Sequence, residues 1–326
     1  MSIKHPIVAV TGASGSGTTT IQKAFEHIFS REGIRAVVVE GDSFRRYDRH
    51  QMQEAYQRSL ARGVPINHFG PCANLFDRLE GLFREYSRTG EGLVRRYIRT
   101  AEEAETAGLP VGTFTPWEEM EEGSDLLFYK GLHGGAIETT WSHRKMSPSH
   151  NPIAIRKRQQ LESVDHPGVD IAQWVDLLLG VVPVVNLEWI QKIHRDCRIK
   201  GCSKEAVIQT ILRYMPDYVR YISPQFSLTD INFQRIPLVD TSNPFDDREV
   251  PSPHESMLVI RFREPQHHNF PYFLSMFKNS FMSRRNTLVI PGGSLQLAME
   301  VICTPLVHEL VERRRDAEIY CSRAKP

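Results

Sequence analysis

A glycine-rich segment near the amino terminus has the residues of a phosphate-binding loop, in the order Gly12, Ala13, Ser14, Gly15, Ser16, Gly17, Thr18 and Thr19. Glycine lacks a Cβ, so the backbone N–H groups of such a loop can approach phosphate oxygens closely. Thr19 occupies the position whose hydroxyl usually contacts Mg²⁺, whereas Thr18 stands where the general motif has lysine. We therefore predict a nucleotide site in which another residue supplies the missing positive charge.

A carboxylate at the end of the next predicted strand is the second candidate for chemistry. Asp42 follows Gly41 and the β-branched run at residues 36–40. Open α/β sheets bind ligands at the carboxyl ends of their strands, so this position could bring Asp42 to a bound ligand. The other interpretation is that Asp42 is only a turn or helix N-cap residue ahead of Ser43.

The elements around the glycine-rich loop must position it. An apolar run at residues 6–10 predicts a strand before the loop, and an amphipathic pattern at residues 18–30 predicts a helix after it. Strand, loop and helix in this order favour phosphate binding over a glycine-rich turn that binds nothing.

The rest of the chain alternates between predicted strands and helical segments. Further strands are predicted at residues 126–129, 177–185, 256–262 and 287–290, with a closing amphipathic helix at 295–315. This order predicts an α/β fold of the P-loop NTPase type, with a mostly parallel mixed sheet flanked by helices and some extra strands. We expect a single domain over residues 1–326.

A polar stretch at residues 141–168 interrupts this pattern, with three prolines and a basic run of Arg156, Lys157 and Arg158. It predicts a surface insertion. A basic run of this kind is a solvated face or a partner-binding segment.

Composition excludes several other classes of protein. Of 326 residues, 40% are hydrophobic, and 40 Lys and Arg balance 39 Asp and Glu, which gives no overall attraction for nucleic acid or acidic membranes. No signal core and no apolar stretch long enough to span a bilayer is evident, so we expect a cytoplasmic protein. The five cysteines contain no Cys-x-x-Cys, and we interpret them as reduced thiols.

Several further segments carry a resemblance to a known family. Residues 39–44 read VEGDSF, 186–196 read NLEWIQKIHRD, 131–134 read GLHG and 230–235 read DINFQR. Together with the glycine-rich loop, these segments resemble the bacterial octameric phosphoribulokinases. The resemblance implies ATP-dependent phosphoryl transfer to a sugar phosphate, from ribulose 5-phosphate to ribulose 1,5-bisphosphate, with Mg²⁺.

The resemblance also implies roles for individual residues. Asp42 would be the general base and, with Thr19, a ligand of Mg²⁺. Lys192 and Arg195, three apart on a predicted helix, would act in catalysis by neutralising phosphate charge. Arg49, Arg195 and Lys200 would bind the sugar phosphate. The alternative for the 192–200 cluster is a solvated basic helix face.

Four positions depart from the family pattern. Lys130 stands where the family has a glutamate that supports Mg²⁺, Arg45 and Arg99 replace histidines, and Lys200 replaces an arginine. Lys130 could turn toward the phosphates or swing out to solvent. These changes make the pocket more positive and motivate one alternative, a catalytically impaired paralogue that binds nucleotide or sugar phosphate in a regulatory or scaffolding role. A second alternative is a uridine-type nucleoside kinase, which shares the fold; Thr18 and the segment at residues 192–196 argue against it.

The family resemblance further implies a homo-oligomer, an octamer, with NADH or AMP as effectors. Arg31 and Arg235 are candidate effector contacts or, alternatively, exposed salt-bridge partners.

Overall fold

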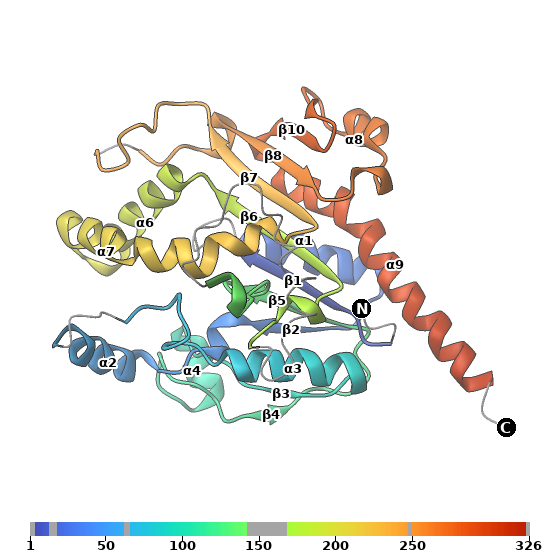
Figure 1. Cartoon of the computed structure of the whole chain (residues 1–326), viewed down its shortest axis with the longest axis horizontal. Coiled ribbons are helices and arrows are strands. Elements are labelled where there is room, and N and C mark those ends of the chain that lie inside the picture. The colour runs from blue at the N-terminus through green and yellow to red at the C-terminus, as the bar shows by residue number, and fades with distance from the viewer. Residues whose placement is uncertain (1–3, 13–17, 62–65, 142–167, 247–248, 324–326) are drawn as a thin grey trace.

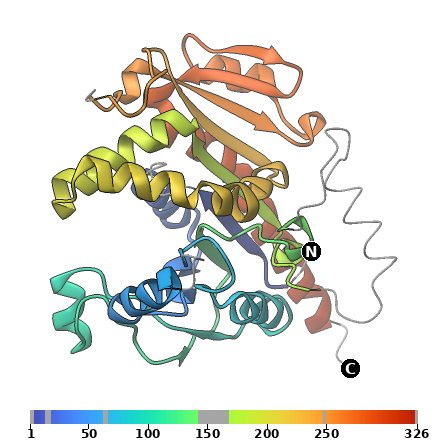
Figure 2. The same ribbon diagram turned by 60° about the vertical axis from the view of Figure 1, so that its left-hand side comes forward.

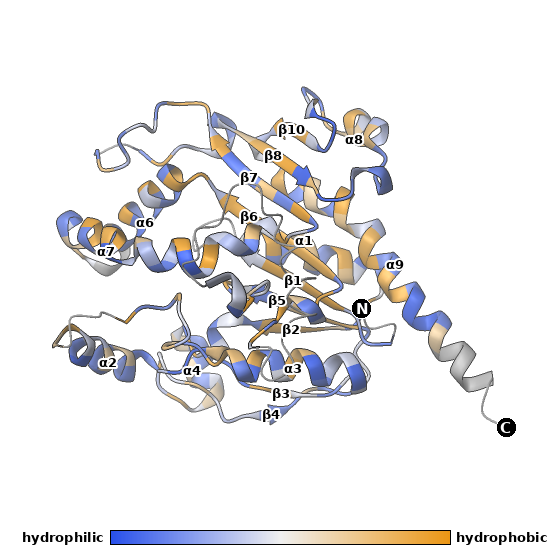
Figure 3. Cartoon of the chain, viewed as in Figure 1, coloured by the Kyte–Doolittle hydropathy of each residue, from blue (hydrophilic) through white to orange (hydrophobic). Residues whose placement is uncertain are grey.

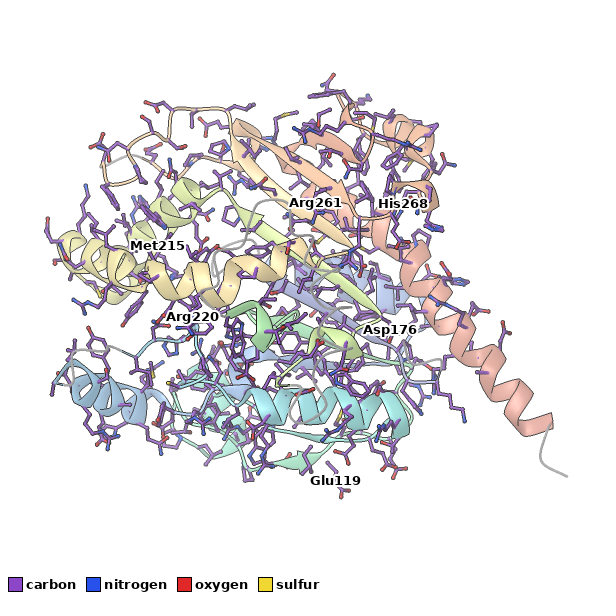
Figure 4. The ribbon with its side chains drawn as sticks, in the orientation of Figure 1. Glu119, Asp176, Met215, Arg220, Arg261 and His268 are labelled. Atoms are coloured by element: carbon purple, nitrogen blue, oxygen red, sulfur yellow. The ribbon has the colours of Figure 1, made fainter. Side chains whose placement is uncertain are left out.

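The computed structural model describes residues 4–12, 18–61, 66–141, 168–246 and 249–323, apart from the side chains at 18–19, 199–200 and 318–323. Most of the predicted phosphate loop and of the predicted insertion, at 13–17 and 142–167, therefore lies outside the described residues. The edges of the insertion are anchored: Trp141 is buried, and Arg220, labelled in Figure 4, donates from Nε to the carbonyl of Trp141 at 2.8 Å.

An eight-stranded sheet forms the centre of the molecule, in the order β2-β5-β1-β6-β7-β8-β10-β9. The strands from β2 to β7 in this order are parallel, and β8, β10 and β9 continue the sheet in antiparallel pairs. The mostly parallel mixed sheet predicted from the sequence is therefore confirmed. In Figures 1 and 2 the antiparallel strands lie in the upper part of the molecule. The bounds are β1 Ile7–Gly12, β2 Ala36–Glu40, β5 Leu126–Gly131, β6 Leu177–Pro183, β7 Ile231–Pro237, β8 Ser256–Phe262, β9 Phe281–Arg284 and β10 Thr287–Pro291.

The central strands β1, β5 and β6 are mostly apolar, because helices cover both faces of a parallel sheet. Figure 3 shows hydrophobic residues concentrated in β1, β5 and β6, and every residue of β1 and β6 is buried. Two core clusters lie on opposite faces. One includes residues of α1 and α9, and the other includes residues of α3. The helices are α1 Thr18–Glu32, α2 Arg49–Ala61, α3 Phe76–Thr89, α4 Ala101–Ala107, α6 Val185–Lys200, α7 Lys204–Asp217, α8 Phe270–Met276 and α9 Leu295–Arg323.

Two local details differ from the sequence prediction. The strand predicted at 177–185 ends at Pro183, and Val185 already begins α6. Residues 231–237, which the sequence marked only as a family segment, form β7, which joins the parallel to the antiparallel half of the sheet. A small second sheet pairs β3 Leu93–Val94 with β4 Glu118–Glu119.

The closing helix α9 is longer than predicted and more apolar than expected. The segment Gly292–Ala317 is long and apolar enough to cross a membrane by length and composition, with a mean hydropathy of 1.2, which the sequence analysis did not anticipate. In the fold α9 packs against α1, and Met299, Ile302 and Val307 belong to the same core cluster as the strands. This is the environment of a core helix.

Candidate active site

Several of the predicted site residues lie at the carboxyl ends of three neighbouring strands, β1, β2 and β5, at one edge of the sheet. β1 ends at Gly12, next to the predicted phosphate loop, and α1 begins at Thr18. β2 ends at Glu40 and runs into a short 3₁₀ helix, Gly41–Phe44, that carries Asp42. β5 lies between β1 and β2, with Lys130 paired in register to both strands. Figure 1 shows α2, α4 and α6 on the side of the molecule to which β2 and β6 lead.

Five charged side chains form a continuous chain of ion pairs across this edge. Lys130 Nζ lies 3.1 Å from Glu40 Oε1. Arg99 bridges two carboxylates, contacting Glu40 Oε2 and lying 2.7 Å from Asp42 Oδ2. Arg45 completes the chain at 2.6 Å from Asp42 Oδ1. The signs alternate, so each carboxylate lies between two cations.

This arrangement holds Asp42 in its ionised form. Burial by itself would raise the pKa of Asp42, but the guanidinium groups of Arg45 and Arg99 outweigh burial and lower this pKa below its usual value. Burial also disfavours the charged form of Arg99, yet Asp42 and Glu40 more than offset this and raise the pKa of Arg99. The site therefore contains an ionised carboxylate that accepts a hydrogen bond from Arg99 at one oxygen and forms an ion pair with Arg45 at the other.

Arg95 supports the segment that carries Asp42, and the sequence analysis missed it. Its Nε donates to the carbonyl of Ser43 at 2.8 Å and its second nitrogen to the carbonyl of Arg45 at 2.6 Å. The guanidinium packs over the rings of Phe114 and Trp117, 3.8 and 4.7 Å from their centroids. No motif surrounds Arg95, and its partners are distant in sequence, so only the fold identifies it.

A buried polar layer lies beneath the site. The Tyr129 hydroxyl fills the space beside Gly41, where a Cβ would lie 2.5 Å from that oxygen, so Gly41 has no room for a side chain. Gln225 fixes the segment after β5, because it accepts from the Gly135 N–H at 3.0 Å and donates to the Leu132 carbonyl at 3.0 Å.

His133 lies in this layer and gives a pH-dependent contribution to stability. It is 4% exposed, and burial lowers its pKa to about 4. The unfolded chain has a histidine pKa near 6.5 and so binds more protons than the folded chain between pH 6.5 and 4. The free energy of unfolding should therefore fall by roughly 3 kcal/mol as the pH is lowered through this window.

Urea unfolding at pH 7 and pH 4.5 measures this effect. Other groups also titrate in this range, so the comparison is with His133→Gln, which should lose clearly less stability than the wild type on acidification. Equal losses in both proteins would contradict the assignment.

The predicted basic cluster lies on α6, where a helix was expected. Lys192 Nζ is 2.8 Å from Asp196 Oδ2, and Arg195 Nε is 3.1 Å from Asp196 Oδ1. One buried aspartate thus holds both cations together. On the same helix Glu188 accepts from the Tyr218 hydroxyl at 3.0 Å, and burial raises the pKa of Glu188 to about 7.

The remaining predicted residues are more scattered. Arg49 begins α2, and its N–H donates to the Gly112 carbonyl at 2.9 Å. Arg31, near the end of α1, contacts Glu32 and Thr304. Arg235 is partly buried in β7 and donates to Ser256 Oγ at 3.1 Å. The side chains of Thr19 and Lys200 lie outside the described part of the chain.

A pocket of about 490 Å³ adjoins the site along β2, between that strand and the segment at residues 94–118. Its lining includes Glu40, Ser43 and Arg95 but none of the predicted site residues. Among the described residues, no group of three or more His, Cys, Asp or Glu side chains could hold a metal ion.

Comparisons with known proteins agree with this fold. Residues 7–147 and 162–242 match the model of the Phosphoribulokinase / Uridine kinase family. The chain is 52% identical over 314 residues to a phosphoribulokinase of Sinorhizobium medicae, covering 96% of this chain and 99% of that protein. It is 50% identical over 318 residues to a chromosomal phosphoribulokinase of Cupriavidus necator, covering 97% and 99%. The solved phosphoribulokinase from Rhodobacter spheroides superposes with a TM-score of 0.81 at 45% identity, covering 96% of this chain and 100% of that one.

Proposed function

The chain belongs to the Phosphoribulokinase / Uridine kinase family, and we propose that it is a phosphoribulokinase, an ATP-dependent kinase that converts ribulose 5-phosphate to ribulose 1,5-bisphosphate. The observation that carries the proposal is the near full-length identity to phosphoribulokinases. Asp42, ionised at the strand edge where α/β folds bind ligands, supports the same chemistry.

In the proposed reaction Asp42 is the general base. A sugar hydroxyl attacks the γ-phosphorus of ATP, the new O–P bond forms, and the bond to the β-phosphate oxygen breaks to release ADP. The hydroxyl proton passes to a carboxylate oxygen of Asp42. Both oxygens are engaged by Arg45 and Arg99, so one guanidinium must turn away before the carboxylate can accept that proton.

Cationic side chains supply the charge neutralisation that phosphoryl transfer needs. We assign Lys192 and Arg195 to the transferred charge and Arg49, Arg195 and Lys200 to the phosphate of the sugar. Asp196 supports this assignment because it holds Lys192 and Arg195 side by side on α6. Arginine suits a phosphate because its planar fork can donate two parallel hydrogen bonds.

Mg²⁺ is part of the proposal, with Thr19 and Asp42 as its protein ligands. The described carboxylates do not offer a ready site, because all four oxygens of Glu40 and Asp42 face a cation. Asp42 becomes available only when an arginine withdraws. The ion, when bound with ATP, would neutralise charge on the phosphates.

A coupled assay of ADP release with ribulose 5-phosphate tests the function. We expect turnover on the order of 1–100 s⁻¹ that requires the sugar phosphate. Equal ADP release with and without the sugar phosphate would count against the proposal. Rapid phosphorylation of uridine would support the nucleoside-kinase alternative, and tight ATP binding without transfer to any acceptor would support the impaired paralogue.

The proposal also includes a cytoplasmic homo-oligomer, an octamer, under effector control by NADH or AMP. Arg31 and Arg235 remain the proposed effector contacts. They lie on α1 and β7, outside the Asp42 ion-pair chain. Assays of the enzyme with and without each effector, for the wild type and Arg235→Gln, would test this part separately.

A further inference from the structure

Lys130 lies on the nucleotide side of the sheet, and the alternation of β5 explains why. Successive strand residues point to opposite faces. Phe128 packs on Phe25 of α1, whereas Tyr129 belongs to the cluster under α3. Lys130, two residues after Phe128, therefore faces α1, the helix that follows the predicted phosphate loop.

The contacts of the ammonium group fix its position further. Lys130 Nζ donates to Gln22 Oε1 at 2.7 Å, and Gln22 lies about one turn into α1. The side chain is only 13% exposed, so it has neither swung out to solvent nor remained without partners. On its other side the ammonium contacts Glu40, two residues before Asp42.

Lys130 thus lies between the proposed sites of the phosphate donor and of the acceptor hydroxyl. In register it pairs with Val10 on the β1 side, two residues before Gly12, and with Glu40 on the β2 side. The phosphate donor belongs beside α1 and the acceptor hydroxyl beside Asp42. A cation between them meets the group that is being transferred.

The ion-pair chain allows Lys130 to change partners. Glu40 is also bound by Arg99 through its other oxygen, so the carboxylate keeps a cation when Lys130 leaves. Lysine has a flexible stem and a compact charge, which suit such a movement. Lys192, by contrast, is held by Asp196 within α6.

From these observations we infer that Lys130 is the ammonium group that binds the terminal phosphate of ATP, supplying the charge that Thr18 does not supply in the loop. In the free protein it rests on Glu40 and Gln22, and it moves to the phosphate when the nucleotide binds. The inference rests on the proposed function and deepens it, by naming a residue specific to the phosphate donor.

Three substitutions test the inference in the full chain. Lys130→Met keeps the length of the stem and removes the charge, Lys130→Arg restores a cation, and Lys278→Met removes an exposed lysine next to β9 as a control. We expect Lys130→Met to lower kcat/KM for ATP about a hundredfold, with KM for ribulose 5-phosphate within about threefold of wild type. Lys130→Arg should recover at least about a tenth of the activity, and Lys278→Met should match the wild type.

Calorimetric titration with ATP, without acceptor or Mg²⁺, gives a second and independent measurement. We expect affinity to fall about tenfold in Lys130→Met and much less in Lys130→Arg. If the wild type phosphorylates ribulose 5-phosphate and Lys130→Met keeps kcat/KM for ATP within threefold, the inference is wrong while the function stands. If the wild type is inactive, the function fails and the ATP affinities alone decide: a tenfold loss supports Lys130 as the phosphate ligand, and unchanged affinity overturns it.

A structural role for Lys130 predicts a different result. Loss of packing would lower the unfolding temperature and weaken the binding of both ATP and ribulose 5-phosphate. In that case Lys130→Arg would not rescue ATP binding selectively. That outcome would also overturn the inference. Should Lys130→Met fail to fold, Lys130→Gln is measured in its place and judged by the same thresholds.

Discussion

Replacing Asp42 by asparagine is expected to lower kcat about a thousandfold while ATP binding stays within about threefold of wild type. General-base catalysis by a positioned carboxylate contributes about 10²- to 10⁴-fold, and an amide of the same shape cannot take up the proton. The amide oxygen can still accept one hydrogen bond from Arg45 or Arg99, so the local structure should persist. The coupled assay gives kcat, and calorimetric titration with ATP gives the affinity.

A matched control removes an acidic residue elsewhere. Asp77→Asn changes an exposed carboxylate in the first turn of α3 and should leave kcat within about twofold of wild type. An Asp42→Asn protein that retains more than a tenth of the wild-type kcat would show that another group accepts the proton.

Replacing Phe128 by alanine is expected to lower the free energy of unfolding by about 4 kcal/mol, because large-to-small changes of a buried aromatic leave a cavity in the core. Phe128 is 1% exposed. Its ring stacks on Phe25 with centroids 4.4 Å apart and meets Phe29 edge-on at 5.5 Å. This aromatic contact packs α1 against β5, so its loss should weaken the support of the predicted phosphate loop, which precedes α1. Urea unfolding followed by circular dichroism measures the change.

Phe281→Ala is the matched control for this prediction. Phe281 begins the edge strand β9 and is 52% exposed, so the same chemical change should cost less than about 1 kcal/mol. A loss in Phe128→Ala no larger than in Phe281→Ala would contradict the packing that joins α1 to the sheet.

Three of the four cations that depart from the family pattern have a different effect from the one expected from the sequence. Counted alone, Arg45, Arg99 and Lys130 make the pocket strongly positive. In the fold they alternate with Glu40 and Asp42, so most of their charge is neutralised locally. Glu40 lies within the family segment at residues 39–44, but no site role was assigned to it from the sequence. Its role follows only from the cations that surround it.

Local patterns in the sequence were sufficient to predict most of the parallel sheet and the position of Asp42. Apolar runs at β1, β5 and β6 identify buried strands because helices cover both faces of a parallel sheet. The β-branched run at β2 identifies the partly exposed edge strand. β7 escaped prediction, since the polar residues Asn232, Gln234 and Arg235 interrupt its apolar pattern. The shared helix face of Lys192 and Arg195 was also predictable from the sequence, because residues three or four apart on a helix are neighbours.

The contacts of the site itself were decided only by the tertiary structure. Arg99 meets Asp42 across 57 residues of sequence, and Lys130 meets Gln22 across 108. From the sequence, the Lys130 side chain could point toward the phosphates or toward solvent. In the fold this side chain lies between Glu40 and Gln22. Charged side chains with flexible stems take the partners that the folded backbone brings within a few ångströms, and no spacing along the chain encodes that choice.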